Sequence, residues 1–204
     1  MRHPLLAWID EHHPRAAETL RPPPSEAALA EARLPPALAA LYREHDGQEE
    51  GDMAASFFDE AFYWLPLALG AERSAMVREV VENVRRELPE AEPFGDAWRV
   101  FGGDLLGNLL VVDVEKDEVF PWFRDEGRIE DAPSESSEEF VARYLDQLRS
   151  GDRVIDPKLG VVDPHPPPLP PSPAPPPPNK GVLVAIVLGL VAFVLFVVWL
   201  EATR

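Results

Sequence analysis

The sequence predicts an α+β domain with a small mixed or antiparallel-rich sheet flanked by helices, followed by a proline-rich stalk and a single transmembrane helix. Three observations lead to this prediction. Segments with a helical period surround three strand-like runs at hairpin spacing, prolines crowd the region after residue 163, and a final stretch carries no charge. We therefore divide the chain into a globular domain (1–160), a proline-rich linker (161–180), a membrane helix (181–200) and a short tail (201–204).

The N-terminal region contains two short predicted helices. Residues 4–12 (PLLAWIDEH) form an amphipathic segment, and Pro14 is expected to stop it. Ser25 follows three consecutive prolines and is placed to cap a second helix, EAALAEAR (26–33).

A third helix and an edge strand are predicted next. The helix begins at Leu34-Pro35, and Gly47 is the natural left-handed residue to cap it. Residues 63–67 (YWLPL) are strand-like, but Pro66 restricts them to an edge or a strand end. The apolar face of the helix comprises Leu38, Leu41 and Tyr42.

A long helix precedes the main strands. Its apolar residues keep a 3.6-residue period until Pro89; they are Met76, Val77, Val80, Val81, Val84 and Leu88. The strand candidates that follow are WRVF (98–101), NLLVVD (108–113) and EVFPWF (118–123).

A final helix closes the predicted domain. Ser136 and Glu139 form a capping box at its start, and Gly151 ends it. The side chains expected to face the core are Phe140, Val141, Tyr144, Leu145 and Leu148.

The segment from Gly181 to Leu200 predicts a transmembrane helix. Twenty residues at about 1.5 Å each span about 30 Å, the thickness of a bilayer's hydrocarbon core. Fifteen of them are Val, Leu, Ile or Phe, which favours insertion by about 5–9 kcal/mol. Small residues recur every four positions at Gly181, Ala185 and Gly189. They place small side chains on one face of the helix, which permits the close approach needed for weak homodimerisation.

The expected orientation rests on the N-terminal sequence. Only Leu5–Ile9 are continuously apolar there, which is too short for the core of a signal peptide. Lys180 and Arg204 flank the two ends of the hydrophobic segment and cancel as topological signals. We expect a C-terminally anchored, single-pass membrane protein with its globular domain on the cytoplasmic side.

The linker has a composition typical of an extended spacer. Eleven of the fifteen residues from Pro164 to Pro178 are proline, so this stretch should adopt polyproline II and span about 45 Å. Its PxxP spacings also suit an adaptor domain, but a spacer that holds the domain clear of the membrane is the favoured interpretation.

The acidic charge lies entirely in the first 160 residues. The net charge is −17, and the charged residues beyond Gly160 cancel one another. Such a field repels nucleic acid and anionic lipid and favours basic protein partners, although the same acidity can simply confer solubility. The acidic residues expected to contribute to a partner surface are Asp46, Asp52, Asp59, Glu60, Asp104 and Asp125.

No cofactor or metal site is expected. The chain has no cysteine, so disulfides and thiolate metal sites are excluded. None of the five histidines has zinc-binding spacing, because the only close pair, His12 and His13, is adjacent and diverges from any one helix face.

The glycine-rich stretch FGGDLLGNLLVVD (101–113) allows three interpretations. A nucleotide loop needs a helix after its glycines, and here a β-branched strand follows. A cation loop needs closely alternating oxygen ligands, whereas Asp104, Asn108 and Asp113 are four and five residues apart. The favoured interpretation is a hairpin turn with glycine at positive φ and with Asp104 and Asn108 bonding its backbone. Such a turn is structural and is also placed to present a surface.

Five segments occur in the order typical of a known family. They are LPPALAALYREHDGQ (34–48), YWLPL (63–67), VFGGDLLGNLLVVD (100–113), VFPWF (119–123) and SSEEFVARYLDQL (136–148). On these segments, about residues 5–150 resemble the SUKH superfamily, which contains the SMI/KNR cell-wall regulators and toxin-immunity domains. The ten motif residues are Leu34, Pro35, Asp46, Gly47, Trp64, Phe101, Asp104, Gly107, Asn108 and Asp113.

The resemblance implies an α+β domain that binds other proteins and has no catalytic residues. Many bacterial members neutralise toxins, and fungal members regulate cell-wall synthesis. The leading hypothesis is therefore a membrane-anchored, non-catalytic protein-binding module, such as an immunity protein whose acidic surface blocks a basic toxin. The alternative is a scaffold or regulator at a cell-envelope or secretion assembly.

A hydrolase is the remote alternative. No serine lies in a G-x-S-x-G elbow, and His45 is the only histidine in the middle of the domain. Carboxylate pairs exist through sheer abundance, which leaves a glycosidase-type pair open.

Overall fold

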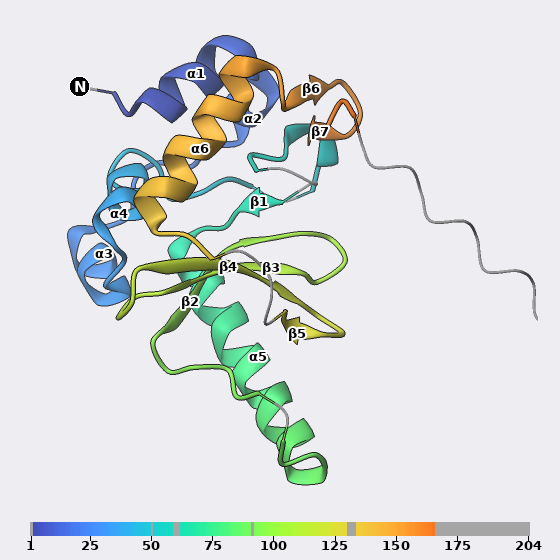
Figure 1. Ribbon diagram of the computed structural model, residues 1–204. Helices are drawn as coiled ribbons and strands as arrows, with labels where there is room; N and C mark the ends of the chain where they lie inside the picture. Colours follow the sequence, from blue (N-terminus) through green and yellow to red (C-terminus); the bar gives the residue numbers. More distant parts are fainter. Residues whose placement is uncertain (1, 50, 59–61, 91, 130–133, 166–204) are drawn as a thin grey trace, which may run out of the picture. The chain divides into compact units, whose positions relative to one another are not determined.

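The computed structural model describes residues 2–49, 51–58, 62–90, 92–129 and 134–165 (Figure 1). These residues form an α+β fold with a five-stranded antiparallel sheet and helices, as the sequence predicts. The predicted membrane helix (181–200), most of the linker and the tail lie outside the described residues. Within the described ranges, no helix combines the length and the apolar character needed to cross a bilayer.

The sheet is a meander in which each strand pairs with the next one along the chain. All pairs among the described strands are antiparallel, and β1 and β5 form the edges. The three predicted central strands are confirmed, and the YWLPL segment supplies the short edge strand. The strands are β1 (Tyr63–Trp64), β2 (Trp98–Gly103), β3 (Leu109–Asp113), β4 (Glu118–Phe123) and β5 (Gly127–Arg128).

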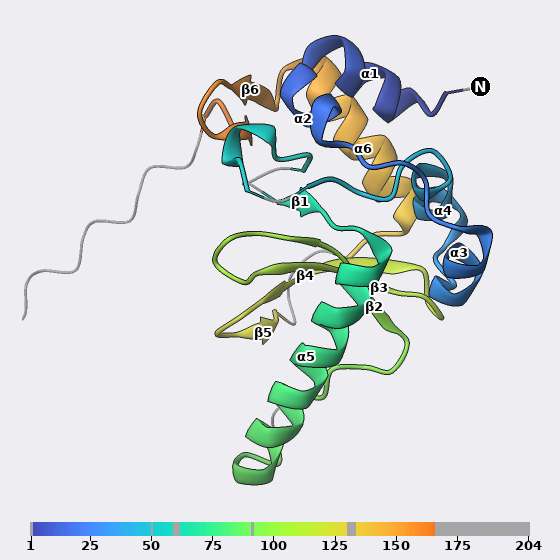
Figure 2. The ribbon, with the colours of Figure 1, turned by 180° about the vertical axis from the view of Figure 1, so that it is seen from behind.

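Helices cover both faces of the sheet (Figures 1 and 2). Alternate residues of the strands therefore point into two apolar clusters: Val111 and Phe120 face α5 (Leu67–Glu87), whereas Val112 and Val119 face the other helices. These other helices are α1 (Pro4–His12), α2 (Pro14–Thr19), α3 (Glu26–Ala32), α4 (Pro36–Tyr42) and α6 (Ser137–Ser150).

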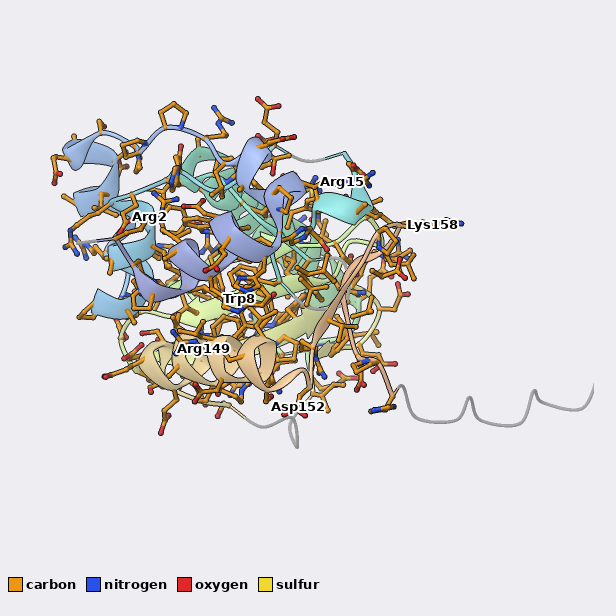
Figure 3. The ribbon with its side chains drawn as sticks, turned by 90° about the horizontal axis from the view of Figure 1, so that it is seen from above. Arg2, Trp8, Arg15, Arg149, Asp152 and Lys158 are labelled. Carbon is orange, nitrogen blue, oxygen red and sulfur yellow. The ribbon has the colours of Figure 1, made fainter. Side chains whose placement is uncertain are left out.

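The helical layer opposite α5 contains the first and last helices of the domain side by side (Figure 3). Trp8 of α1 lies between α1 and α6 and stacks on His12, with ring centroids 4.5 Å apart. The Tyr144 hydroxyl of α6 donates a 2.5 Å hydrogen bond to the carbonyl of Phe57. The predicted capping box of Ser136 and Glu139 is confirmed.

The predicted bounds of the first helix are confirmed, but two other predicted helix boundaries need correction. Pro14, which follows α1, is also the first residue of α2, where its missing N–H is not needed. Gly47 is not the cap of α4, which ends at Tyr42 with Arg43 in the right-handed helical region. In addition, α5 begins at Leu67, nine residues before the first apolar residue assigned to it.

A small hairpin extends the domain past its predicted end. Strands β6 (Val154–Asp156) and β7 (Gly160–Val162) pair with each other, and a short 3₁₀ helix, η1 (Met53–Ala55), contacts β7. Val161 is fully buried in the core. The predicted boundary at residue 160 therefore falls within β7, and the compact unit runs through His165.

The segment Asp46–Gln48 joins several of these elements. The Oδ1 atom of Asp46 accepts a 2.8 Å hydrogen bond from the N–H of Leu67, one of the free donors at the start of α5. Gly47 has a φ of 67°, and a Cβ there would lie 2.5 Å from the carbonyl carbon of Leu65. Gln48 exchanges hydrogen bonds with Trp64 through both its backbone and its side chain.

Replacing Gly47 by alanine should destabilise residues 1–165 by more than about 1 kcal/mol, because the new Cβ meets backbone and not a flexible side chain. Urea unfolding measures the loss. Gly151→Ala is the matched control, since Gly151 also has positive φ (83°) but no atom lies within 4 Å of its added Cβ. Equal losses for the two variants would show that the close approach at Gly47 does not matter.

Two histidines stabilise the N-terminal helices in their neutral form. The Nδ1 atom of His3 accepts a hydrogen bond from the N–H of Leu5 and caps α1. The Nε2 atom of buried His13 lies 3.1 Å from the carbonyl oxygen of Ser56. Burial lowers the pKa of both side chains.

The domain should therefore lose stability as the pH falls from 7.5 to 5.5. Both pKa values are lower in the folded state, so below the unfolded value of 6.5 the unfolded chain binds more protons. Urea unfolding at the two pH values measures this loss, and the variant His3→Asn/His13→Gln should show a smaller difference. A stability that is unchanged or rises on acidification would contradict the assignment.

Candidate functional site

The motif residues of the helical half are parts of the scaffold. Trp64 and Phe101 are buried in the core, and Leu34 packs against it while partly buried. Pro35 is the N-cap residue of α4. Together with the contacts of Asp46 and Gly47 described above, these positions serve to fix the fold.

Asp104, Gly107 and Asn108 build the turn between β2 and β3. The Oδ1 atom of Asp104 accepts hydrogen bonds from the backbone N–H groups of Leu106 (2.9 Å) and Asn108 (2.8 Å). Its Oδ2 atom accepts another from the Asn108 side chain, and Gly107 has a φ of 92°. The predicted hairpin turn, with its glycine at positive φ, is confirmed.

The cation-loop interpretation does not fit this geometry. Asp113 ends β3, whereas Asn108 precedes the strand, so about 17 Å of extended chain separates the two residues. The Asp113 carboxylate is buried and accepts hydrogen bonds from the Trp98 indole N–H (3.2 Å) and from the backbone N–H groups of Glu115 and Lys116. Within the described part of the chain, no three His, Asp or Glu side chains form a cluster that could hold a metal.

Of the acidic residues predicted to meet a partner, the four that the structure describes have different structural roles. Asp46 caps α5, and Asp52 accepts a hydrogen bond from the Ala54 N–H at the start of η1. Asp59 and Glu60 lie outside the described residues. Among the described members of the set, Asp104 and Asp125 line the same groove.

This groove, here called the α5 groove, is the main candidate for a functional site. It lies between α5, the β2–β3 turn and the β4–β5 turn, and its volume is ≈ 1110 Å³. Its floor includes Leu109 and Trp122, which belong to the apolar cluster beneath α5. The exposed apolar residues along it are Met76, Val80, Val84, Leu105 and Leu106.

The groove arises because α5 packs most closely against the sheet in its N-terminal half, where its two buried residues lie. Gly70 packs directly against the Val100 carbonyl, and the Ser74 hydroxyl accepts a 3.0 Å hydrogen bond from the Val100 N–H. Farther along α5, Val77 and Val81 still pack against the apolar cluster of the sheet while partly buried, and the C-terminal end of the helix projects past the sheet (Figures 1 and 2). Val80 consequently remains 55% exposed although it continues the apolar period of the helix.

The β2–β3 turn supplies the opposite wall. Leu105 and Leu106 at its tip are 60% and 68% exposed. The same Asp104 hydrogen bonds that close the turn fix the backbone that carries these two leucines. The polar motif residues thus give the turn a defined shape, and its two apolar side chains face solvent.

The sequence predicts the turn and the helix but not the groove between them. The available signal was the leucine pair between Asp104 and Gly107, because two adjacent leucines at a turn tip have no core to enter. The apolar residues of α5 gave a second signal, since they occupy a wider part of the helix surface than one sheet can cover.

A second cavity lies between the sheet and α6. Its volume is ≈ 510 Å³, and most of its lining is apolar, including Phe58, Leu110 and Phe140.

His13 and Ser56 lie close together, but His13 contacts the Ser56 carbonyl and both residues are buried. This pair is not arranged as a nucleophile and base.

Replacing Asp104 by alanine should destabilise residues 1–165 by about 1–2 kcal/mol, because three hydrogen bonds to a carboxylate are lost. Amide exchange at Leu106 and Asn108 should accelerate more than exchange in β3. Asp125→Ala is the control: its exposed carboxylate pairs only with Arg124 among the described residues, so the expected loss is at most about 0.5 kcal/mol. Equal effects of the two substitutions would refute the structural role of Asp104.

The chain was also compared with known proteins. It matches no model of a known protein family and no curated protein. The assignment of function therefore rests on the residues and on the geometry of the α5 groove.

Proposed function

We propose that this chain is a membrane-anchored, non-catalytic protein-binding module whose domain is a member of the SUKH superfamily. The observation that carries this proposal is the α5 groove, an exposed apolar surface with charged margins. Monomeric soluble domains rarely expose contiguous apolar patches of this kind unless they bind something. A groove with these properties fits a protein or peptide partner.

The roles of the motif residues support binding over catalysis. Asp46, Asp104 and Asp113 each accept backbone hydrogen bonds that hold a turn or a helix end. Carboxylates used in this way are held by the fold as parts of its turns and helix ends. A glycosidase-type pair would instead need two carboxylates about 5–10 Å apart on either side of a substrate.

The membrane anchor is part of the proposal and rests on composition. The uncharged residues 181–200 are long enough to cross a bilayer, and the proline-rich segment before them is suited to act as a spacer. We place the domain on the cytoplasmic side, where an immunity protein would meet a basic toxin as the toxin enters. The net charge of −17 would accelerate association with such a partner.

A scaffold or regulator at a cell-envelope or secretion assembly is the second candidate. The feature that favours it is the row of small residues Gly181, Ala185 and Gly189, which permits contact with another membrane helix. In that case the hydrophobic segment or the stalk, and not the groove, would recruit the partner.

Co-isolation from the native organism distinguishes these candidates. Residues 1–165 and the full chain serve as parallel baits at low and high salt. The immunity-type proposal predicts that residues 1–165 suffice and that a basic partner dissociates as salt increases. Recovery by the full chain alone would contradict it and favour the scaffold. If neither bait recovers a protein, the binding proposal itself fails.

A further inference from the structure

We infer that the α5 groove binds an amphipathic helical segment of the partner, with an apolar face toward the groove and basic residues at its margins. This inference rests on the proposed function and specifies the chemistry of the partner. The groove offers Met76, Val80 and Val84 at helical spacing on one wall and the Leu105-Leu106 pair on the other. An apolar helix face laid between two such walls would be covered on both sides.

The shape of the groove suits a helix. Met76 to Val84 rise about 12 Å along α5, which corresponds to two to three turns of a partner helix. A helix of about 15 residues would bury its i, i+3, i+4 and i+7 side chains against this wall. The volume of ≈ 1110 Å³ exceeds that of most small-molecule pockets, so a peptide segment fits better than a metabolite.

Strand addition is disfavoured because, among the described residues, neither edge strand of the five-stranded sheet offers a long template. β1 and β5 contain two residues each, and both residues of β1 are fully buried. A partner strand would therefore find few free backbone groups along either edge.

The charges around the groove select a basic partner. Its described lining residues include five carboxylates and three guanidinium groups. Arg124 pairs with Asp125 (3.2 Å), and Arg128 pairs with Glu118 (2.8 Å). Glu90, Glu92 and Glu126 have no salt bridge to any described residue, so their charges are available to lysine or arginine.

The same charges argue against a second copy as the occupant. A symmetric pair would bring two acidic margins together, and each chain carries a net charge of −17. Repulsion between like charges would oppose that contact.

The direct test uses a designed 15-residue peptide with leucines on one helix face and lysines elsewhere. Fluorescence anisotropy measures its affinity for the full chain in detergent and for two double variants. Leu105→Ser/Leu106→Ser should weaken binding about tenfold or more, because both side chains would lose apolar contacts. Met53→Ser/Leu159→Ser is the matched control: both residues are exposed and apolar but lie outside the groove, so the affinity should change less than about twofold.

A second pair of measurements tests the charge requirement. A peptide with glutamates in place of the lysines should not bind. The variant Glu90→Gln/Glu92→Gln/Glu126→Gln should bind the lysine peptide more weakly and with a smaller salt dependence. Equal affinity for both peptides would overturn the assignment of a basic partner.

Several outcomes would overturn the groove assignment. They are the absence of lysine-peptide binding, equal weakening by the two double variants, and a dimer in sedimentation that only the Leu105→Ser/Leu106→Ser variant disrupts. The proposed function is tested separately with the partner recovered by co-isolation. If that partner binds both double variants equally, the protein-binding function stands and the groove inference falls. If no partner is ever recovered, both fail.

Discussion

The buried side chain of Gln48 connects parts of the domain that are distant in sequence. Its Nε2 atom donates hydrogen bonds to the Ala55 carbonyl (2.7 Å) and the Thr19 hydroxyl (3.1 Å), and its Oε1 atom accepts one from the Trp64 N–H (3.0 Å). The side chain is fully buried, so each of these groups would be costly to leave unpaired. Because Asp46 caps α5 two residues earlier, this short segment fixes α2, η1, β1 and the start of α5 together.

The groove is a consequence of this arrangement. Asp46 fixes where α5 begins, and Gly70 with Ser74 fixes where it meets β2. Farther along the helix, Val77 and Val81 are only partly buried against the sheet, and Met76, Val80 and Val84 stay exposed. The Asp104 turn rises on the other side of the same gap. Structural polar residues thus define two walls whose outward side chains are apolar, which is the arrangement that a binding scaffold requires.

The sequence predicted the elements better than their relations. The capping box at Ser136, the turn at Asp104 and the central strands depend on local patterns, and the structure confirms them. The predicted role of Gly47 as a helix cap was wrong. Its positive φ allows a close approach to Leu65, which lies 18 residues away in the sequence. The groove was missed for the same reason: periodicity identifies an apolar helix face but does not say how far the sheet extends beneath it.

The motif residues maintain the scaffold, and we propose that the α5 groove binds the partner. Amide hydrogen exchange of the full chain, measured with and without the co-isolated partner, tests this division of roles. Added protection is expected in two separate stretches, the second half of α5 and residues 104–108, with little change in α1 and α6. Protection concentrated on α1 and α6, with α5 unchanged, would place the binding surface on the opposite face and contradict the account.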